Sequence, residues 1–296
     1  MKRVLLVFNP KSGRGDFIKS LYSVISLFSR AGYEVAVYPT TSSGDAKDYV
    51  QKRGSHFDLV VCAGGDGMIS EVVNAYMKMD APPPLGYIPT GTTNDFAVSL
   101  GIPKVHTEAA DAVLNGQARN IDIGRFGGQY FSYVAAFGKF TDVSYSTAQS
   151  AKNILGRAAY IFEGIKQLGN LDAVNCEIDI DGEIIAGDFI LGVVTNMTTV
   201  AGFRVPADKD SSVDDGLFEA IFVRSPQSLA ELPGTIAALT DPSAEADTVI
   251  RRTAKKINFT HKNPCGWTVD GEFGGEHSNI TLENIRRALS IILPPQ

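Results

Sequence analysis

The chain has 296 residues, of which 44% are hydrophobic and 20% are charged, and its formal net charge is −6. This length predicts two globular domains, and the composition excludes a long disordered tail. The acidic balance argues against nucleic acid as a partner, because nucleic-acid-binding proteins gain affinity from a positive surface. It also argues against a basic patch for anionic lipid, so any membrane contact would be peripheral and apolar.

The three cysteines are far apart and form no CxxC pair, which indicates neither a disulfide framework nor a zinc site. They favour a reducing, cytoplasmic compartment. The apolar run that follows Lys2 and Arg3 ends at Phe8, and we interpret it as a first strand rather than a signal peptide. No run of about 18 apolar residues occurs, so the sequence predicts no transmembrane segment.

Over the first 120 residues, short apolar runs alternate with helical patterns. Since the expected strands are apolar throughout, this alternation predicts an α/β domain with a parallel sheet covered by helices on both faces. The expected helices cover residues 16–30, 45–53, 68–79, 93–100 and 106–115.

After about residue 120 the pattern changes to period-two strands joined by glycine turns, which predicts a mainly antiparallel second domain. We place the hinge near residues 120–124. Two helical patterns interrupt the strands, at residues 156–168 and 226–239. The first carries apolar residues at helical spacing, which is typical of a core stripe, and a lipid-facing stripe is the alternative.

Three glycine-containing loops follow three of the expected strands: "NPKSGRG" at residues 9–15, "GGDGM" at 64–68 and "PTGTTND" at 89–95. Helix N-termini at the carboxyl ends of parallel strands favour an anion, and glycines let the backbone approach a phosphate closely. Each loop alone is also an ordinary turn, but together they predict a polyphosphate site. Neither GxxxxGK[ST] nor GxGxxG after a strand is present, so a nucleotide would be held in another way.

Acidic residues at two places in the chain could take part in chemistry at a phosphate site. Asp66 places a negative charge among phosphate donors, which suits a Mg²⁺ ion that bridges it to the phosphates; the alternative is that Asp66 caps the helix beginning at Gly67. Near the end of the chain, Asp270 or Glu272 could accept a hydroxyl proton in a kinase reaction. The alternative for this Asp-Gly-Glu is a plain hairpin turn, which we expect for the same tripeptide at Asp181.

Other chemistries find little support. Ser12 has no obvious His and acid partners, so a serine hydrolase is not expected. The four histidines show no metal-ligand spacing, and we expect them in loops or on solvated faces: His56, His106, His261 and His277.

The chain resembles the diacylglycerol kinase catalytic family in its soluble bacterial lipid kinase form, which is related to sphingosine kinases and more distantly to NAD kinases. The matching segments run in family order over nearly the whole chain: "NPKSG", "GGDG" with Glu71 and Asn74, "IPTGTTNDFAVSLGIP", "VDDGLFE" at 213–219 and "VDGE" at 269–272.

This resemblance implies a fold. Residues 1–122 would form a nucleotide-binding α/β domain with a parallel, Rossmann-like or NAD kinase-like sheet. Residues 123–284 would form a mainly antiparallel β-sandwich domain, with the acceptor cleft between the two. The segment from about 285 to 296 would return to the first domain.

The resemblance also implies ATP and Mg²⁺ as ligands. The family's metal position falls on Asp215 with the backbone carbonyls of Ser212 and Leu217, and its base on the Asp-Gly-Glu at Asp270 and Glu272. The chain departs from the family at position 68, where threonine is usual. The implied ATP-binding residues are Asn9, Pro10, Lys11, Ser12, Gly13, Thr40, Gly65, Asp66, Gly67, Met68, Ile69, Ser70, Glu71 and Thr92.

The leading hypothesis is a cytoplasmic, Mg²⁺-dependent kinase that transfers the γ-phosphoryl group of ATP to a lipid hydroxyl, with diacylglycerol to phosphatidic acid as the first choice. Its membrane contact would be peripheral. The alternatives are a soluble kinase of the NAD kinase type and an inactive nucleotide- or lipid-binding regulator, for which Met68 is the only support. The sequence leaves open the lipid acceptor, the choice between Asp270 and Glu272 as base, and the oligomeric state, a homodimer included.

Overall fold

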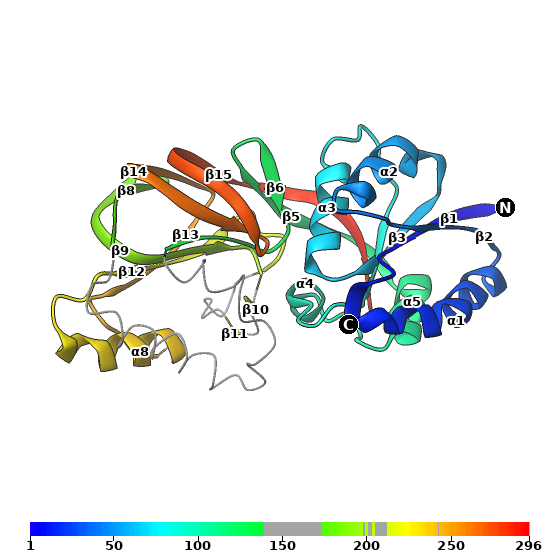
Figure 1. Ribbon diagram of the computed structural model, residues 1–296, viewed down its shortest axis with the longest axis horizontal. Helices are drawn as coiled ribbons and strands as arrows, with labels where there is room; N and C mark the ends of the chain where they lie inside the picture. The colour runs from blue at the N-terminus through cyan, green and yellow to red at the C-terminus, as the bar shows by residue number, and fades with distance from the viewer. Residues whose placement is uncertain (139–172, 198, 201–202, 205–211, 242, 296) are drawn as a thin grey trace. The chain divides into compact units, whose positions relative to one another are not determined.

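The chain divides into two compact units. A computed structural model describes residues 1–138, 173–197, 199–200, 203–204, 212–241 and 243–295 (Figure 1). Unit 1 comprises Met1–Ile123, Gln129–Ser132 and Ile285–Gln296, and unit 2 comprises Gly124–Gly128 and Tyr133–Asn284. The division expected from the sequence did not include the return of the short segment Gln129–Ser132 to unit 1.

Unit 1 is built on parallel strands. β1 pairs in parallel with both β2 and β3, and β3 pairs in parallel with β4. β3 is buried along its whole length, whereas β2, at the edge, is half exposed. This pairing agrees with the expectation from the apolar strands of the sequence. The four strands are β1 (Lys2–Phe8), β2 (Tyr33–Pro39), β3 (Leu59–Gly64) and β4 (Leu85–Pro89).

Helices cover both faces of this sheet (Figure 1): α1 packs against α5 on one side, and α2 packs against α3 on the other. The helices are α1 (Asp16–Arg30), α2 (Asp45–Arg53), α3 (Asp66–Tyr76), α4 (Asp95–Ser99) and α5 (His106–Asn115), with the short helices η1 (Ser12–Gly15) and η2 (Gly54–His56).

Three of the five predicted helices have the observed bounds, and two do not. α3 begins two residues before the predicted start at residue 68, because the chain turns into the helix directly after Gly65. α4 begins two residues later than predicted, because Asn94 has a left-handed backbone, with φ 54°, that an α-helix cannot contain. Among the described residues, no helix is long and apolar enough to cross a membrane.

Within unit 2 the described strands pair antiparallel, as the sequence predicts. β9 pairs with β7, β8 and β12, and β14 pairs with β7, β8 and β15. β9 and β14 therefore each meet β8 through one half and β7 through the other, so these four strands close a ring. The strands are β5 (Gln117–Phe126), β6 (Gln129–Phe131), β7 (Val134–Gly138), β8 (Val174–Ile180), β9 (Glu183–Thr195), β10 (Thr199–Val200), β11 (Phe203–Arg204), β12 (Phe218–Arg224), β13 (Val249–Ala254), β14 (Lys256–Val269) and β15 (Glu272–Leu293), of which β5 and β15 also contribute residues to unit 1.

One helix of unit 2 is described. The sequence predicts a helix over residues 226–239, and the structure has η3 (Leu229–Glu231) followed by α8 (Leu232–Thr240). The start is later because the side chain of Glu231 accepts hydrogen bonds from the backbone of Gln227 and the hydroxyl of Ser228, which holds these residues in a turn. The other predicted helix, at 156–168, lies outside the described residues.

The core of unit 2 is an aromatic cluster that contains a histidine. Phe259 and Trp267 lie with their ring centroids 4.9 Å apart, and the ring of His261 stacks on Phe259 at 6.2 Å. His261 is only 3% exposed, and neither of its ring nitrogens has a hydrogen-bond partner. The expectation that all four histidines lie in loops or on solvated faces is therefore wrong for His261, because β14 turns this residue into the interior of the ring of strands.

Burial, and to a smaller extent the nearby His277, lower the pKa of His261 to about 4. We predict that acid destabilises the protein through this residue: below the ordinary histidine pKa of about 6.5, the unfolded chain binds a proton that the folded chain refuses. The loss of stability begins as the pH falls through about 6.5 and is complete near pH 4. In His261→Phe, which keeps an aromatic ring, the urea midpoint should change less between about pH 7 and about pH 5 than in the wild type.

The exposed His56 supplies the control, because His56→Phe should leave this pH dependence as it is in the wild type. An equal acid shift of the urea midpoint in His261→Phe and in the wild type would contradict the prediction.

Candidate functional site

The loops that follow β1, β3 and β4 meet backbone to backbone. A Cβ atom on Gly13 would lie 2.0 Å from the carbonyl oxygen of Thr90, and one on Gly91 would lie 2.7 Å from the Cα of Gly65. The N–H of Thr90 donates a 2.8 Å hydrogen bond to the carbonyl of Gly64. No larger side chain fits these contacts, so the glycines of the three predicted loops are required for the loops to come together.

The first loop is a tight turn with its lysine in solvent. The side-chain oxygen of Asn9 accepts the N–H of Lys11 at 2.9 Å, and the carbonyl of Asn9 accepts the N–H of Ser12 at 3.2 Å. Gly13 follows with φ 54°, a left-handed conformation that favours glycine. Lys11 is exposed and Pro10 is half-buried, so the turn presents a charged side chain beside a fixed backbone.

A fourth loop, after β2, reaches the same end of the sheet. The N–H of Thr40 donates to the carbonyl of Phe8 at 2.9 Å, at the end of β1. The carboxylate of Glu71, on α3, accepts the N–H of Gly44 at 2.8 Å. At the start of α2, Asp45 accepts hydrogen bonds from the hydroxyl of Tyr38 and the backbone of Thr41. Thr40 and Glu71, both predicted to bind ATP, are thus joined to the three glycine loops.

Asp66 does not cap its own helix. It is the first residue of α3, whose N-cap is Gly65, so Asp66 does not occupy the cap position that the alternative gave it. Its carboxylate instead accepts the N–H of Phe96 at 3.4 Å, at the start of α4. Burial, and then the negative charge of Asp95, raise the pKa of Asp66 to about 6, while the backbone N–H groups of α4 lower it. Two carboxylates therefore share a poorly solvated place beside the glycine loops.

Met68 is buried against the loop that precedes it. It is 7% exposed, and a Cβ atom on Gly64 would lie 2.5 Å from its sulfur. Ile69 is buried as well, whereas Gly67 and Ser70 are partly buried and Thr92 is exposed. Met68 thus fills a space inside unit 1, and a contact between this side chain and a nucleotide stays a prediction of the sequence.

Asp270 occupies a two-residue hairpin turn between β14 and β15. Asp270 and Gly271 have φ values of 48° and 82°, and Asp181 and Gly182 of the β8–β9 hairpin have 48° and 98°. The two Asp-Gly pairs therefore form the same kind of turn, as the hairpin alternative predicted. They differ in burial, because Asp270 is 3% exposed whereas Asp181 is exposed.

The contacts of the two aspartates differ as well. One carboxylate oxygen of Asp270 accepts the N–H groups of Tyr133 and Val134, at 3.0 and 3.1 Å, and its own N–H donates to the carbonyl of Val134 at 2.8 Å. Asp181 caps the turn before β14 at the surface. Glu272 is exposed at the start of β15. Asp270 is thus the buried, oriented carboxylate of its tripeptide.

The predicted metal position forms a compact turn. The carboxylate of Asp215 accepts the N–H of Ser212 at 2.9 Å and the N–H of Leu217 at 2.8 Å. The hydroxyl of Ser212 donates to the neighbouring Asp214 at 2.6 Å. The structure therefore brings together the three residues that the sequence names. Over the described ranges, no group of three or more His, Cys, Asp or Glu side chains could hold a metal ion.

Comparison with known proteins identifies the family. Residues 3–126 match the model of the diacylglycerol kinase catalytic domain. The chain is 37% identical to a diacylglycerol kinase of Bacillus subtilis (strain 168) over 298 residues, covering 100% of this chain and 98% of that one. It is 36% identical to a diacylglycerol kinase of Staphylococcus aureus (strain MRSA252), covering 99% and 93%.

The chain belongs to the diacylglycerol kinase family. A crystal structure of a protein from Bacillus anthracis str. Sterne superposes with a TM-score of 0.84 at 26% identity, covering 99% of this chain and 96% of that one. The resemblance inferred from the motifs is confirmed, and with it a phosphotransferase that acts on an alcohol group.

In each unit the structure shows residues beside the predicted ones that the sequence did not assign. Asp95 lies in the quoted "GTTNDFA" segment but received no role. Asn74, also part of the family match, clasps the backbone of Tyr130: its amide donates to the carbonyl at 2.8 Å and its side-chain oxygen accepts the N–H at 3.0 Å. Tyr133 and Val134 belong to no motif, and no sequence signal could have found them because they act through backbone N–H groups.

We predict opposite effects of two Asp→Asn substitutions on the stability of this kinase. The pKa of Asp66 is raised in the folded protein, so ionising this carboxyl group at neutral pH costs the folded state more than the unfolded state. Asp66→Asn removes this cost and should raise the melting temperature at neutral pH in EDTA. Hydrogen bonds from Tyr38 and Thr41 lower the pKa of Asp45, so its charge favours folding at neutral pH and Asp45→Asn should lower the melting temperature. A fall in both variants would contradict the assignment for Asp66.

Proposed function

We propose that this kinase transfers the γ-phosphoryl group of ATP to the hydroxyl of diacylglycerol and so forms phosphatidic acid. The observation that carries this proposal is the backbone contact of the loops after β1, β3 and β4, which gathers glycines, N–H groups and a lysine at one end of a parallel sheet. Whole-length identity of 37% to a diacylglycerol kinase supports the choice of acceptor.

The nucleotide phosphates would bind at this loop cluster. In Gly65–Glu71, the N–H groups at the start of α3 would donate to phosphate oxygens, because the first N–H groups of an α-helix have no partner within the helix. In Asn9–Gly13, the N–H groups of Lys11 and Ser12 already donate to Asn9, so this turn would contribute mainly its lysine. Thr40 and Thr92 would contribute hydroxyl groups. Lys11, which is exposed, would add one positive charge.

Two cation sites follow from the donor chemistry. A Mg²⁺ ion carried by the phosphates would neutralise charge during transfer. Asp66 and Asp95 fit such an ion, because the charge of Asp95 raises the cost of ionising Asp66 and a cation beside them would reduce that cost. A second ion would bind Asp215 with the carbonyls of Ser212 and Leu217, an all-oxygen set that suits Mg²⁺.

Asp270 is the proposed general base. Its carboxylate is held by two backbone N–H groups, so its orientation is fixed before the acceptor arrives. It would accept the proton of the lipid hydroxyl as the phosphoryl group is transferred. Glu272, exposed two residues later, is the second candidate.

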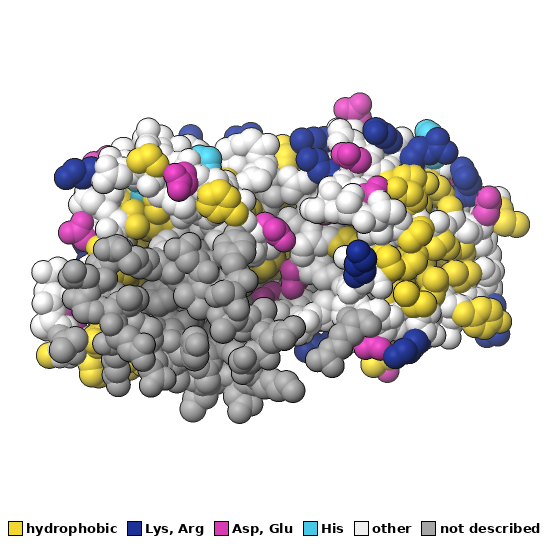
Figure 2. All heavy atoms as spheres, in the orientation of Figure 1, with side chains coloured by type: hydrophobic (Ala, Val, Ile, Leu, Met, Phe, Trp, Pro, Cys, Tyr) yellow, Lys and Arg dark blue, Asp and Glu magenta, His cyan; other side chains and the backbone are white. Residues whose placement is uncertain are grey.

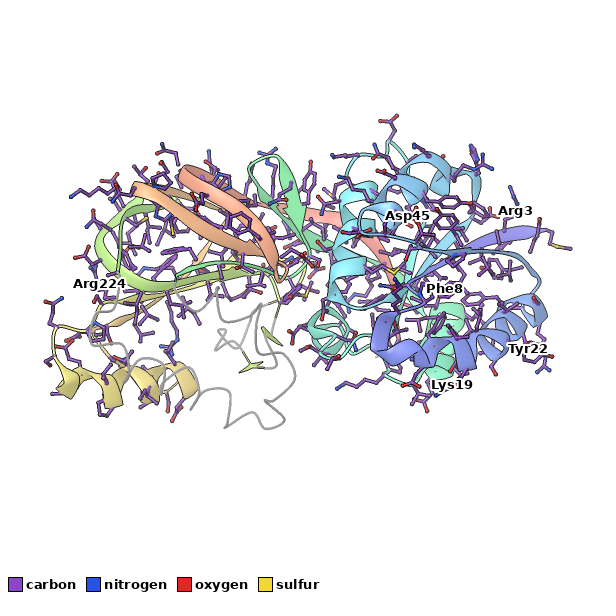
Figure 3. The ribbon with its side chains drawn as sticks, viewed as in Figure 1. Arg3, Phe8, Lys19, Tyr22, Asp45 and Arg224 are labelled. Carbon is purple, nitrogen blue, oxygen red and sulfur yellow. The ribbon has the colours of Figure 1, made fainter. Side chains whose placement is uncertain are left out.

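The setting that we propose is the cytoplasmic side of a membrane, with peripheral contact only. All three cysteines are free and buried, which fits a reducing compartment. Figure 2 shows hydrophobic side chains gathered over unit 1. On α1, Ile18 is 53% exposed and Tyr22 is 81% exposed, and Tyr22 and Lys19 extend outward from the helix (Figure 3).

We also propose a fold class for each of the two units. The parallel register of β1 to β4, with helices on both faces, supports a Rossmann-like sheet of the NAD kinase type for unit 1. The antiparallel pairing of β7, β8, β9, β12, β13 and β14 supports a β-sandwich for unit 2.

The function is tested with γ-³²P-ATP and a panel of acceptors in detergent micelles: diacylglycerol, ceramide, phosphatidylglycerol, a polyprenol and, without micelles, NAD⁺. We expect label in the organic phase with diacylglycerol, and none without Mg²⁺. Label only on NAD⁺ would establish the soluble kinase alternative. No transfer to any acceptor, with ATP still bound, would establish the regulator.

The base is tested by two matched amide substitutions. Asp270→Asn keeps the shape of the side chain but removes the proton acceptor, so kcat should fall by about 10² to 10⁴. Glu272→Gln should change kcat by less than about tenfold, because Glu272 is exposed. The reverse pattern in steady-state kinetics would transfer the role to Glu272.

A further inference from the structure

Asp270 depends on a backbone segment that has no motif of its own. Its carboxylate is oriented by the N–H groups of Tyr133 and Val134, at 3.0 and 3.1 Å. Tyr133 directly precedes β7, so strand pairing holds this segment from Val134 onward. A contact on the Tyr133 side helps to keep the carboxylate in one direction.

The hydroxyl of Thr195 holds the Tyr133 side of this segment. Thr195 is the last residue of β9 and is fully buried. Its hydroxyl donates to the carbonyl of Tyr133 and accepts the N–H of Met197 at 3.0 Å. Thr195 pairs with Val134 on β7 and with Glu219 on β12, so the sheet fixes the backbone that carries the hydroxyl from both sides.

The carbonyl of Tyr133 and the N–H of Val134 belong to the same peptide group. The Thr195 hydroxyl therefore binds one end of a peptide group whose other end donates to Asp270. Hydrogen bonds in such a chain polarise one another, on the order of 10–30% per bond in low-dielectric surroundings. The hydroxyl thus both orients the peptide group and strengthens its donation to the carboxylate.

We propose that Thr195 is a positioning residue that fixes the Asp270 carboxylate through the Tyr133–Val134 peptide group. This inference rests on the proposed role of Asp270 as the base. Packing alone does not account for a threonine at this position, because valine has the same shape and would fill the same buried space on β9 without a hydroxyl that needs partners.

The test compares Thr195→Val, which removes only the hydroxyl function, with Thr195→Ser, which keeps it. We expect kcat in Thr195→Val to fall by about three- to tenfold while KM for ATP stays within about twofold. The acid limb of the pH–rate profile should move upward by about half a pH unit, because the ionised carboxylate loses part of its hydrogen bonding. Thr195→Ser should restore both quantities.

Thr235 on α8 supplies the matched control. It is 2% exposed, and its hydroxyl donates to the carbonyl of Glu231 at 2.9 Å and contacts the hydroxyl of Thr248 at 2.6 Å. Thr235→Val should lower the melting temperature as Thr195→Val does but leave kcat and the pH profile unchanged. An equal fall of kcat in Thr235→Val would mean that lost stability explains the effect, and would overturn the proposal.

Asp270→Asn, measured in parallel, distinguishes a failure of the proposed base from a failure of the Thr195 proposal. Wild-type activity in Asp270→Asn would remove the proposed base, and Thr195 with it. Loss of activity in Asp270→Asn together with wild-type kcat and pH profile in Thr195→Val would overturn the Thr195 proposal alone. If the valine variant does not fold, Thr195→Ala against Thr195→Ser isolates the hydroxyl, and equal kcat in these two would also overturn the proposal.

Discussion

The close approach of three backbone loops is the constraint on which unit 1 depends. Parallel strands end at the same edge of a sheet, so the loops after β1, β3 and β4 must share one small space. Gly13 against Thr90 and Gly65 against Gly91 show how little room is left. Glycine lets these loops touch, and in the binding mode that we propose the same residue type would also let a phosphate approach the backbone.

The sequence predicts this part of the molecule well because its signals are local. The helices at 16–30, 45–53 and 106–115 have the expected bounds, since their periodicity and flanking turns lie within the segment itself. The bounds at Asn94 could not be read in the same way. A left-handed residue there delays α4, and only the folded loop shows it.

Contacts between residues far apart in the sequence explain the predictions that were wrong. Asp66 was expected at its own helix, but its hydrogen-bond donors come from α4, 30 residues later. His261 was expected in solvent, but the ring formed by β7, β8, β9 and β14 encloses it among Phe259 and Trp267. The pair Asp181 and Asp270 is the clearest case: identical tripeptides in identical turns differ in burial because only one turn folds against Tyr133 and Val134.

Asp66 and Asp270 are two poorly solvated aspartates, one in each unit. Burial and the charge of Asp95 raise the pKa of Asp66 to about 6, and Asp270 is only 3% exposed, so folding removes both carboxyl groups from water. Selection for stability alone would remove both features. Each is held by backbone N–H groups that compensate part of the cost, from α4 in one unit and from the segment before β7 in the other. Poorly solvated carboxyl groups of this kind are typical of residues kept for chemistry, and in each unit the aspartate belongs to a family motif.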